Sequence, residues 1–250
     1  MAQRFEARPH DLLWLKRVPH WHGAPDWVAA TLARLPVVVV RRAGAPRGLV
    51  SIGVRGAQRN QRYGAWLSIA EIEHCVRPEQ LQAVLSDAPR PAGEGGVMPP
   101  LAAGRASLPA FVVAQGLPAL LRRFRMVWGP TGSVGFELAT GDPVVQPTSD
   151  LDLLIRLPEW IGRDTAQALL GTLSTHAAQT GVRLDAQLET PAGAVSLAEY
   201  AGSTRRVLLR NGGEPILVDD PWALGVNSTN QASADTLARR VSDDTCEADA

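Results

Sequence analysis

Short apolar runs separated by turn-forming residues characterise the first hundred positions of the chain. Residues 36–42 and 48–54 are rich in valine and read as strands, with a Gly-Ala-Pro turn at residues 44–46 between them. Residues 67–86 show a helical pattern, and Pro78 stands near the start of a helix. The pattern predicts two strands followed by helical structure.

The second half of the chain alternates helical and strand patterns. Apolar residues recur at helical spacing over residues 107–125, where Gly116 and Pro118 are candidate interruptions. Residues 164–180 form a second predicted helix. The predicted strands cover residues 126–128, 151–157, 182–188, 207–210 and 216–218. This order of helix, strand, turn, strand, helix and strand is typical of a small α/β domain.

Composition divides the chain into domains. Proline and glycine crowd residues 88–100, so we expect an N-terminal domain over 1–90, a linker over 91–105 and a second domain over 106–224. Residues 225–250 are polar and acidic, which predicts a disordered tail. The expected fold class is α/β (α+β), a mixed sheet with helices joined to a smaller N-terminal α+β domain.

Charge is balanced over the whole chain but uneven along it. The sequence has 25 basic and 25 acidic residues, yet no acidic residue lies between Trp27 and Ala70. Seven arginines fall in that stretch: Arg34, Arg41, Arg42, Arg47, Arg55, Arg59 and Arg62. Such a segment favours an anionic partner, and guanidinium groups suit phosphate. The few aromatic residues nearby and the neutral chain argue against nucleic acid as that partner.

The remaining composition limits the class of protein. With only Cys75 and Cys246, no apolar run of membrane-spanning length and no signal-peptide pattern, we expect a cytoplasmic protein without a membrane partner. The five histidines lack metal-ligand spacing. The seven tryptophans are assigned to the core rather than to a cage for a nucleotide base.

Two segments of the second half carry residues suited to phosphoryl chemistry. Gly132 and Ser133 follow one predicted strand, and Asp150 and Asp152 open the next. Side chains alternate along a strand, so both aspartates point to one face while Leu151 enters the core. Neighbouring carboxylates repel each other unless a cation joins them, and their hard oxygens suit Mg²⁺. A Gly-Ser turn offers backbone N–H groups to a polyphosphate.

A third carboxylate is expected from the strand over residues 182–188. Alternation places Asp185, Gln187 and Glu189 on one face. Asp185 is the preferred second-metal ligand and base, with Glu189 as the alternative. An isolated Asp-x-Asp pair is more often a solvated turn, and Ser133 is also a candidate helix N-cap, so the interpretation depends on the combination.

The combination of Gly132-Ser133, Asp150-x-Asp152 and the later Asp185 resembles the DNA polymerase β nucleotidyltransferase superfamily. The resemblance implies a nucleotidyltransferase-type mixed sheet, Mg²⁺ as the cofactor and an in-line displacement that releases pyrophosphate. It also implies that all three aspartates are catalytic metal ligands and that Gly132 and Ser133 bind substrate phosphate.

The chain departs from the commonest superfamily pattern in two ways. Ser133 and Asp150 are 17 positions apart (150 − 133), with residues 136–141 inserted between them, and no arginine follows the serine closely. Phosphate charge must then be met from elsewhere. We expect Arg55 and Arg59 of the arginine-rich segment to supply it.

Longer matches point to one family within this superfamily. They include residues 8–15, 53–62, 132–133, 140–141, 149–153, 207–210 and 219–222. From about Phe5 to Trp222 the chain is similar to the malonate decarboxylase holo-acyl-carrier-protein synthase, also called phosphoribosyl-dephospho-CoA transferase.

That resemblance implies a definite reaction. The prosthetic group of 2'-(5-triphosphoribosyl)-3'-dephospho-CoA would pass to a serine of the apo acyl carrier protein of malonate decarboxylase, with release of pyrophosphate. Two alternatives stay open. One is another Mg²⁺-dependent nucleotidyltransferase that modifies a protein, a small molecule or tRNA. The other is a catalytically silent nucleotidyltransferase fold that serves as a binding module.

Overall fold

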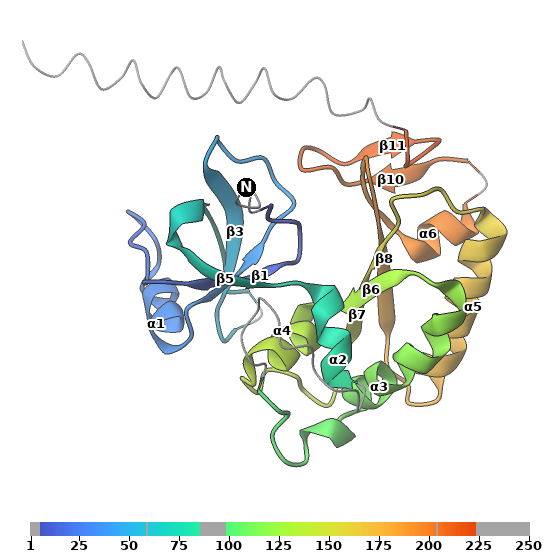
Figure 1. Cartoon of the computed structure of the whole chain (residues 1–250), viewed down its shortest axis with the longest axis horizontal. Helices are drawn as coiled ribbons and strands as arrows, with labels where there is room; N and C mark the ends of the chain where they lie inside the picture. The colour runs from blue at the N-terminus through green and yellow to red at the C-terminus, as the bar shows by residue number, and fades with distance from the viewer. Residues whose placement is uncertain (1–5, 59, 86–98, 204, 224–250) are drawn as a thin grey trace, which may run out of the picture.

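The fold consists of two main sheets, each built by one half of the chain (Figure 1). The computed structural model describes residues 6–58, 60–85, 99–203 and 205–223. Helices and sheets are mixed, as the expected α/β class requires. The predicted tail and residues 91–98 of the predicted linker lie outside the described residues.

The first half forms a five-stranded antiparallel sheet in the order β4-β3-β2-β1-β5. Its elements are β1 (Leu12–Leu15), α1 (Asp26–Arg34), β2 (Val37–Val40), β3 (Leu49–Arg55), β4 (Arg62–Ser68) and β5 (Ile72–Val76). One face of the sheet packs on α1 through Leu13, Val38 and Ile52. Leu12 and Val37 belong instead to the core of the second half, so the sheet is apolar on both faces where it meets that half.

The helix predicted over residues 67–86 is wrong for its first part. Residues 67–76 contain the end of β4, a 3-10 turn and β5, and helical structure begins only at Pro78. The 3-10 turn Pro78–Leu81 runs into α2 (Gln82–Leu85). Strand β5 pairs with β1, which is about sixty residues earlier, and this non-local pairing overrides the local helical pattern.

The second half forms a four-stranded sheet in the order β6-β7-β8-β9, with a β10-β11 ribbon beside it. The strands are β6 (Val127–Pro130), β7 (Leu151–Arg156), β8 (Leu184–Thr190), β9 (Gly193–Ser196), β10 (Val207–Leu209) and β11 (Ile216–Val218). The helices are α3 (Pro109–Leu121), α4 (Gly132–Thr140), α5 (Arg163–Ala178) and α6 (Leu197–Gly202). Strands β7 and β8 are parallel, and α5 provides the crossover that a parallel pair needs.

The core of the second half lies between this sheet and its helices. Phe111 and Leu117 of α3 are fully buried with Leu151 and Leu153 of β7, which confirms that these leucines face inward. Helix α3 continues through Gly116 and Pro118, so the candidate interruption is absent from the structure.

The assignment of every tryptophan to the core is wrong for two of them. The side chains of Trp66 and Trp160 are 56% and 65% exposed, whereas Trp128 is buried. Among the described residues no helix is long and apolar enough to cross a bilayer.

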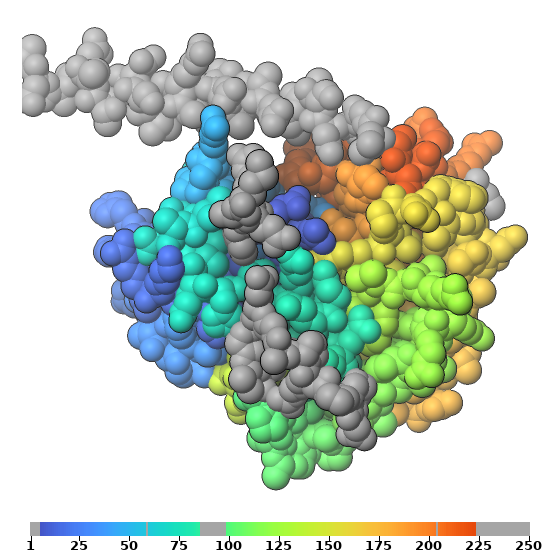
Figure 2. Space-filling view, in the orientation of Figure 1, coloured from blue at the N-terminus to red at the C-terminus, as the bar shows by residue number. Residues whose placement is uncertain are grey.

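The two halves lie directly against each other in the space-filling view (Figure 2). Arg156 of β7 contacts Asp11 at 3.2 Å and Glu79 at 3.1 Å, and Arg34 of α1 donates to Asp142 at 2.9 Å. These ion pairs join residues far apart in the sequence, so they fix the first sheet in place over the second.

Candidate active site

Asp150, Asp152 and Asp185 come together at one edge of the second sheet. Asp150 directly precedes β7, Asp152 is the second residue of β7, and Asp185 is the second residue of β8. Because β7 and β8 are parallel, both begin at the same edge, and Asp152 lies in register with Asp185. One carboxylate oxygen from each residue lies within 4.8 Å of the others. The predicted third carboxylate is thus brought to the predicted pair.

The three carboxylates disturb one another electrostatically. Partial burial is the largest influence on Asp152 and raises its pKa, and the negative charges of Asp150 and Asp185 raise it further. Arg55 and Arg183 act in the opposite direction. A cluster of this kind is unfavourable without a cation, because like charges at short range resist simultaneous ionisation.

The donor set of the cluster suits Mg²⁺. Three hard carboxylate oxygens converge, and neither histidine nor cysteine joins the group among the described residues. A Mg²⁺ ion is usually held by one or two carboxylates together with waters and substrate phosphates, and three clustered aspartates offer enough carboxylates for that, so the residues present fit the expected ion.

Gly132 lies against the central carboxylate. Its φ is +59°, and a Cβ placed on it would stand 2.1 Å from Oδ2 of Asp152. The backbone N–H of Thr131 donates to the carbonyl oxygen of Asp152 at 2.8 Å. Only glycine permits both the left-handed conformation and the contact. This geometry gives the Gly-Ser turn a second role, since it sets the position of Asp152.

Ser133 occupies the first turn of α4. The N-cap of this helix is Thr131, so the alternative in which Ser133 is the cap is wrong. Ser133 is the second helical residue and half-buried. The first turn of a helix presents free N–H groups and the positive end of the helix dipole, which suits phosphate.

The residues inserted between Ser133 and Asp150 form most of α4 and a buried anchor for the following loop. Glu137 is only 2% exposed, and Arg105 donates to both of its carboxylate oxygens, at 2.6 and 2.7 Å. The backbone N–H groups of Val144 and Val145 donate to the same carboxylate, at 2.9 and 2.8 Å. The insertion therefore fixes the loop that leads into Asp150.

Glu189, the alternative to Asp185, has a different partner. Arg42 of the first half forms a two-pronged ion pair with Glu189, and both side chains are largely buried. Asp185 is exposed and accepts from Arg183, which directly precedes β8, at 2.5 Å. Glu189 thus connects the two halves of the chain, and Asp185 belongs to the carboxylate cluster.

One of the two predicted phosphate-binding arginines can be placed. Arg55 is the exposed last residue of β3, and its charge lowers the pKa of Asp152. It lies in register with Arg62 of β4. Like charges directly opposite each other in a sheet are destabilising, so the pair favours an anion. Arg59 lies outside the described residues.

His10 and Asp11 belong to the contact between the two halves, which the sequence patterns did not reveal. Burial is the main cause that lowers the pKa of His10 to about 4, and the nearby charge of Arg42 adds to the effect. Burial raises the pKa of Asp11 to about 6, although Arg156 opposes this shift. The signal that could have marked them is the Arg-Pro-His-Asp sequence at residues 8–11.

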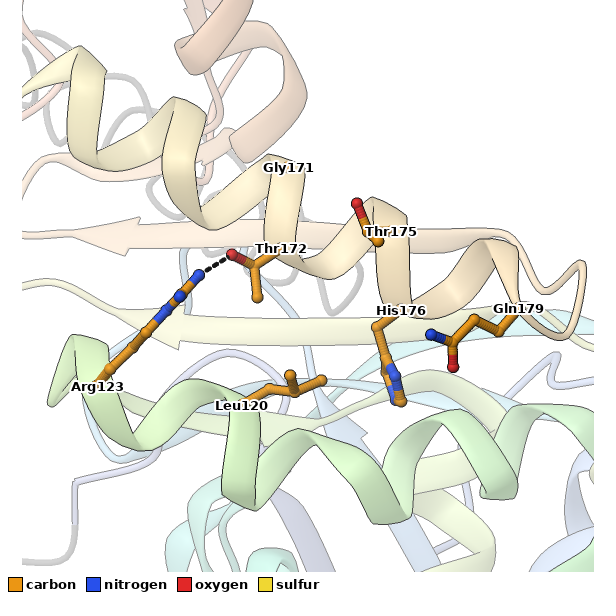
Figure 3. Close-up of a pocket in the computed structure, with 7 residues that line it drawn as sticks. All are labelled: Leu120, Arg123, Gly171, Thr172, Thr175, His176 and Gln179. Carbon is orange, nitrogen blue, oxygen red and sulfur yellow. Dashed lines mark hydrogen bonds between the residues drawn. The ribbon is translucent and has the colours of Figure 1, made fainter.

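A shallow hollow lies between α3 and α5 (Figure 3). Arg123 donates to the hydroxyl of Thr172 across it, and His176 is hydrogen-bonded to the carbonyl of Val113 at 2.9 Å. The residues that line it include no carboxylate and none of the three clustered aspartates. The hollow therefore lacks the donor set of the candidate active site.

Comparison with known proteins decides the family. Residues 8–78 match the family model described as the phosphoribosyl-dephospho-CoA transferase MdcG N-terminal domain, and residues 98–221 match the model of its C-terminal domain. The chain belongs to the phosphoribosyl-dephospho-CoA transferase family. Its members are transferases, so the chain is an enzyme of that class.

Curated relatives extend over nearly the whole chain. A phosphoribosyl-dephospho-CoA transferase of Azotobacter vinelandii is 44% identical over 221 residues, which cover 88% of this chain and 96% of the relative. One from Pseudomonas aeruginosa is 41% identical over 90% of this chain and 98% of the relative. No solved structure matches.

Proposed function

We propose that this transferase moves the phosphoribosyl-dephospho-CoA group of 2'-(5-triphosphoribosyl)-3'-dephospho-CoA to a serine of the apo acyl carrier protein of malonate decarboxylase. Pyrophosphate is the second product. The observation that carries the proposal is the convergence of three carboxylates within 4.8 Å, beside the first turn of α4, in a chain of this family.

Asp150, Asp152 and Asp185 would hold Mg²⁺ in this scheme. When bound, the ion neutralises the polyphosphate of the donor and favours the departure of pyrophosphate. Gly132 and Ser133 present N–H groups and a hydroxyl to the leaving phosphates. Catalysis then consists mainly of positioning and charge neutralisation.

The transfer balances as a single displacement at the α-phosphorus. The carrier serine Oγ forms a bond to phosphorus, and the bond to the oxygen that bridges the α- and β-phosphates breaks. Pyrophosphate leaves with that oxygen. The serine proton passes to a carboxylate. Asp185 is the candidate base because it belongs to the cluster and is the exposed residue of β8, open to an incoming hydroxyl.

Arg55 supplies positive charge from the first half of the chain. Its charge acts on Asp152, and it lies in register with Arg62 of β4, which supports a role for both arginines in binding phosphate. Among the described residues, neither arginine is paired with a carboxylate. Phosphate oxygens of the donor would satisfy them. Arg59 is proposed as a third contributor on its sequence position alone.

Mass spectrometry of the carrier protein tests the proposal. Apo carrier is incubated with purified enzyme, Mg²⁺ and the triphosphoribosyl donor, and a mass gain equal to the prosthetic group is expected. Asp152→Asn should lower the rate by at least about 100-fold, whereas Asp26→Asn, an exposed aspartate in α1, should not. A folded enzyme that leaves the carrier mass unchanged would sink the proposal.

The same assay separates the alternatives. Mass gain on a different acceptor, or incorporation of a nucleotide from ATP or CTP, would indicate another nucleotidyltransferase activity. No Mg²⁺-dependent turnover with any triphosphate donor would indicate a silent module.

A further inference from the structure

An exposed face of the first sheet includes Arg55 and Arg62, and its other members have no role in the chemistry described above. Its members alternate along β3 and β4 or extend from the end of β2. We call them the arginine face: Arg41, Gly53, Arg55, Arg62, Gly64 and Trp66. Cross-strand partners share a face, and the register pairs Arg55 with Arg62 and Gly53 with Gly64.

The arginine face is continuous with the contact between the two halves. Val39 of β2 is paired with Gly53, and the Val39 side chain packs against the core of the second half. Arg55, the last residue of β3, stands at the other end of the face, and its charge acts on Asp152 of the carboxylate cluster. The face therefore runs from the domain contact to the edge of the candidate active site.

The Arg41 side chain extends over the glycine pair. A Cβ built on Gly53 would stand 3.3 Å from Cδ of Arg41, and one built on Gly64 would stand 2.2 Å from its Nη1. The two missing side chains create the space that Arg41 occupies. Its backbone N–H donates to the carbonyl of Ser51 at 2.9 Å. None of the described residues offers its guanidinium a carboxylate, so the outer side of this planar group is open to a ligand.

Trp66 stands beside Arg41 on the same face. The indole is 56% exposed, and its N–H donates to the carbonyl of Gly44 at 3.3 Å. The backbone carbonyl of Trp66 accepts from the indole N–H of Trp21 at 3.0 Å. An exposed tryptophan held by hydrogen bonds costs little further entropy when it stacks on a ring. Planar guanidinium and indole groups both offer π-surfaces for a base.

We infer that the arginine face binds the adenine nucleotide part of the donor, with the base on Arg41 and Trp66 and the phosphates on Arg55 and Arg62. This inference rests on the proposed function and assigns the substrate subsite that it leaves open. Residues on one face of a strand recur roughly every 7 Å, so Arg62 and Trp66, with Gly64 between them, are about 14 Å apart along β4, a distance on the scale of a nucleotide. Charge complementarity favours an anionic nucleotide, and the aromatic group distinguishes it from a plain phosphate site.

Isothermal titration with dephospho-CoA tests the inference in the absence of turnover. Trp66→Ala and Arg41→Ala are each expected to raise the dissociation constant for dephospho-CoA roughly 5- to 100-fold, the range typical of base stacking. Trp160→Ala removes an equally exposed tryptophan of the other half, and Arg47→Ala removes an exposed arginine of the β2–β3 turn. Both controls are expected to bind as the wild type does.

Gly64→Ala provides a variant that keeps every arginine and tryptophan. The new Cβ would meet the mobile end of Arg41, so the guanidinium must leave the face while the strand stays intact. Weaker dephospho-CoA binding is expected. AMP should compete with dephospho-CoA in the wild type, whereas phosphopantetheine should not.

Three results would overturn the inference. Unchanged dissociation constants in Trp66→Ala, Arg41→Ala and Gly64→Ala would do so, provided that wild-type enzyme still modifies the carrier. Wild-type binding of dephospho-CoA by Arg41→Lys would show that residue 41 acts through its charge alone and not through a planar guanidinium. Loss of carrier-protein affinity with normal dephospho-CoA binding would assign the face to the carrier. If the wild type neither binds dephospho-CoA nor modifies the carrier, the proposed function itself has failed.

Discussion

Gly132 and Asp152 approach each other so closely that a Cβ on the glycine would stand 2.1 Å from Oδ2 of the aspartate. The glycine has a φ of +59°, and the preceding residue donates its N–H to the aspartate carbonyl. The turn that is expected to receive phosphate therefore also positions the central carboxylate. One backbone feature would therefore couple the proposed phosphate binding to the proposed metal binding.

Gly132→Ala should abolish transfer while the protein stays folded. The added methyl must displace the Asp152 carboxylate, and the left-handed backbone adds a strain of about 1–2 kcal/mol. Gly23→Ala is the matched control, because Gly23 has a φ of +71° and nothing within 4 Å of its Cβ position. Transfer rate and urea unfolding are measured for both. Equal activity in the two variants would contradict the coupling.

Asp185→Asn and Glu189→Gln should affect different properties. Asp185 is exposed and belongs to the carboxylate cluster, so its variant should lose at least about 100-fold in transfer rate with little change in stability. Glu189 pairs with Arg42 between the two halves, and its variant should unfold at lower urea with its chemistry retained. The opposite assignment would make Glu189 the functional carboxylate.

Glu137→Gln should destabilise the fold by about 3 kcal/mol, because it leaves Arg105 and two backbone N–H groups with a neutral partner in a buried place. Urea denaturation at pH 7.5 measures the effect. Glu71→Gln is the control, since the Glu71–Arg17 pair is exposed to solvent, and it should change stability little. A similar loss in both variants would show that burial does not set the size of the effect.

Stability should depend on pH through His10. Its pKa is lowered to about 4 in the folded protein, so the folded state keeps the ring neutral while the unfolded chain binds a proton below its ordinary pKa of 6.5. Stability is then lost as pH falls from 6.5 toward 4, by about 2 kcal/mol at pH 5.

The comparison of wild type with His10→Asn isolates this contribution. His10 has a φ of +73°, a conformation that asparagine adopts more readily than most residues. The raised pKa of Asp11 acts in the opposite direction in both proteins and largely cancels in the difference. The unfolding free energy should fall less between pH 7.5 and pH 5 in His10→Asn than in the wild type. An identical fall would remove His10 as the cause.

The facing of the carboxylates was predictable because alternation along a strand is a local property. Alternation around Asp150 and Asp152 fixes which side chains share a face, and a parallel pairing brings Asp185 to the same edge. The separate partner of Glu189 was not predictable. It depends on Arg42, which is 147 positions away in the sequence and reaches it only after both halves have folded.

The first sheet shows the same limit. Valine-rich β2 and β3 appear where the pattern places them, whereas the local pattern predicts helix over β5, because the partner of β5, strand β1, lies far away in the sequence. The exposed position of Trp66 is likewise set by the pairing of β3 with β4. Tryptophan identity alone favours the core, whereas alternation along β4 puts Trp66 on the same face as Arg62.

Mn²⁺ binding followed by electron paramagnetic resonance tests the central claim most directly. Free Mn²⁺ gives a strong signal that weakens on binding, so a titration reports occupancy of the Asp150, Asp152 and Asp185 cluster without turnover. The wild type and Asp26→Asn should bind Mn²⁺ in competition with Mg²⁺, and Asp152→Asn should lose that binding. The same isotherm in all three proteins would contradict a metal centre at these aspartates.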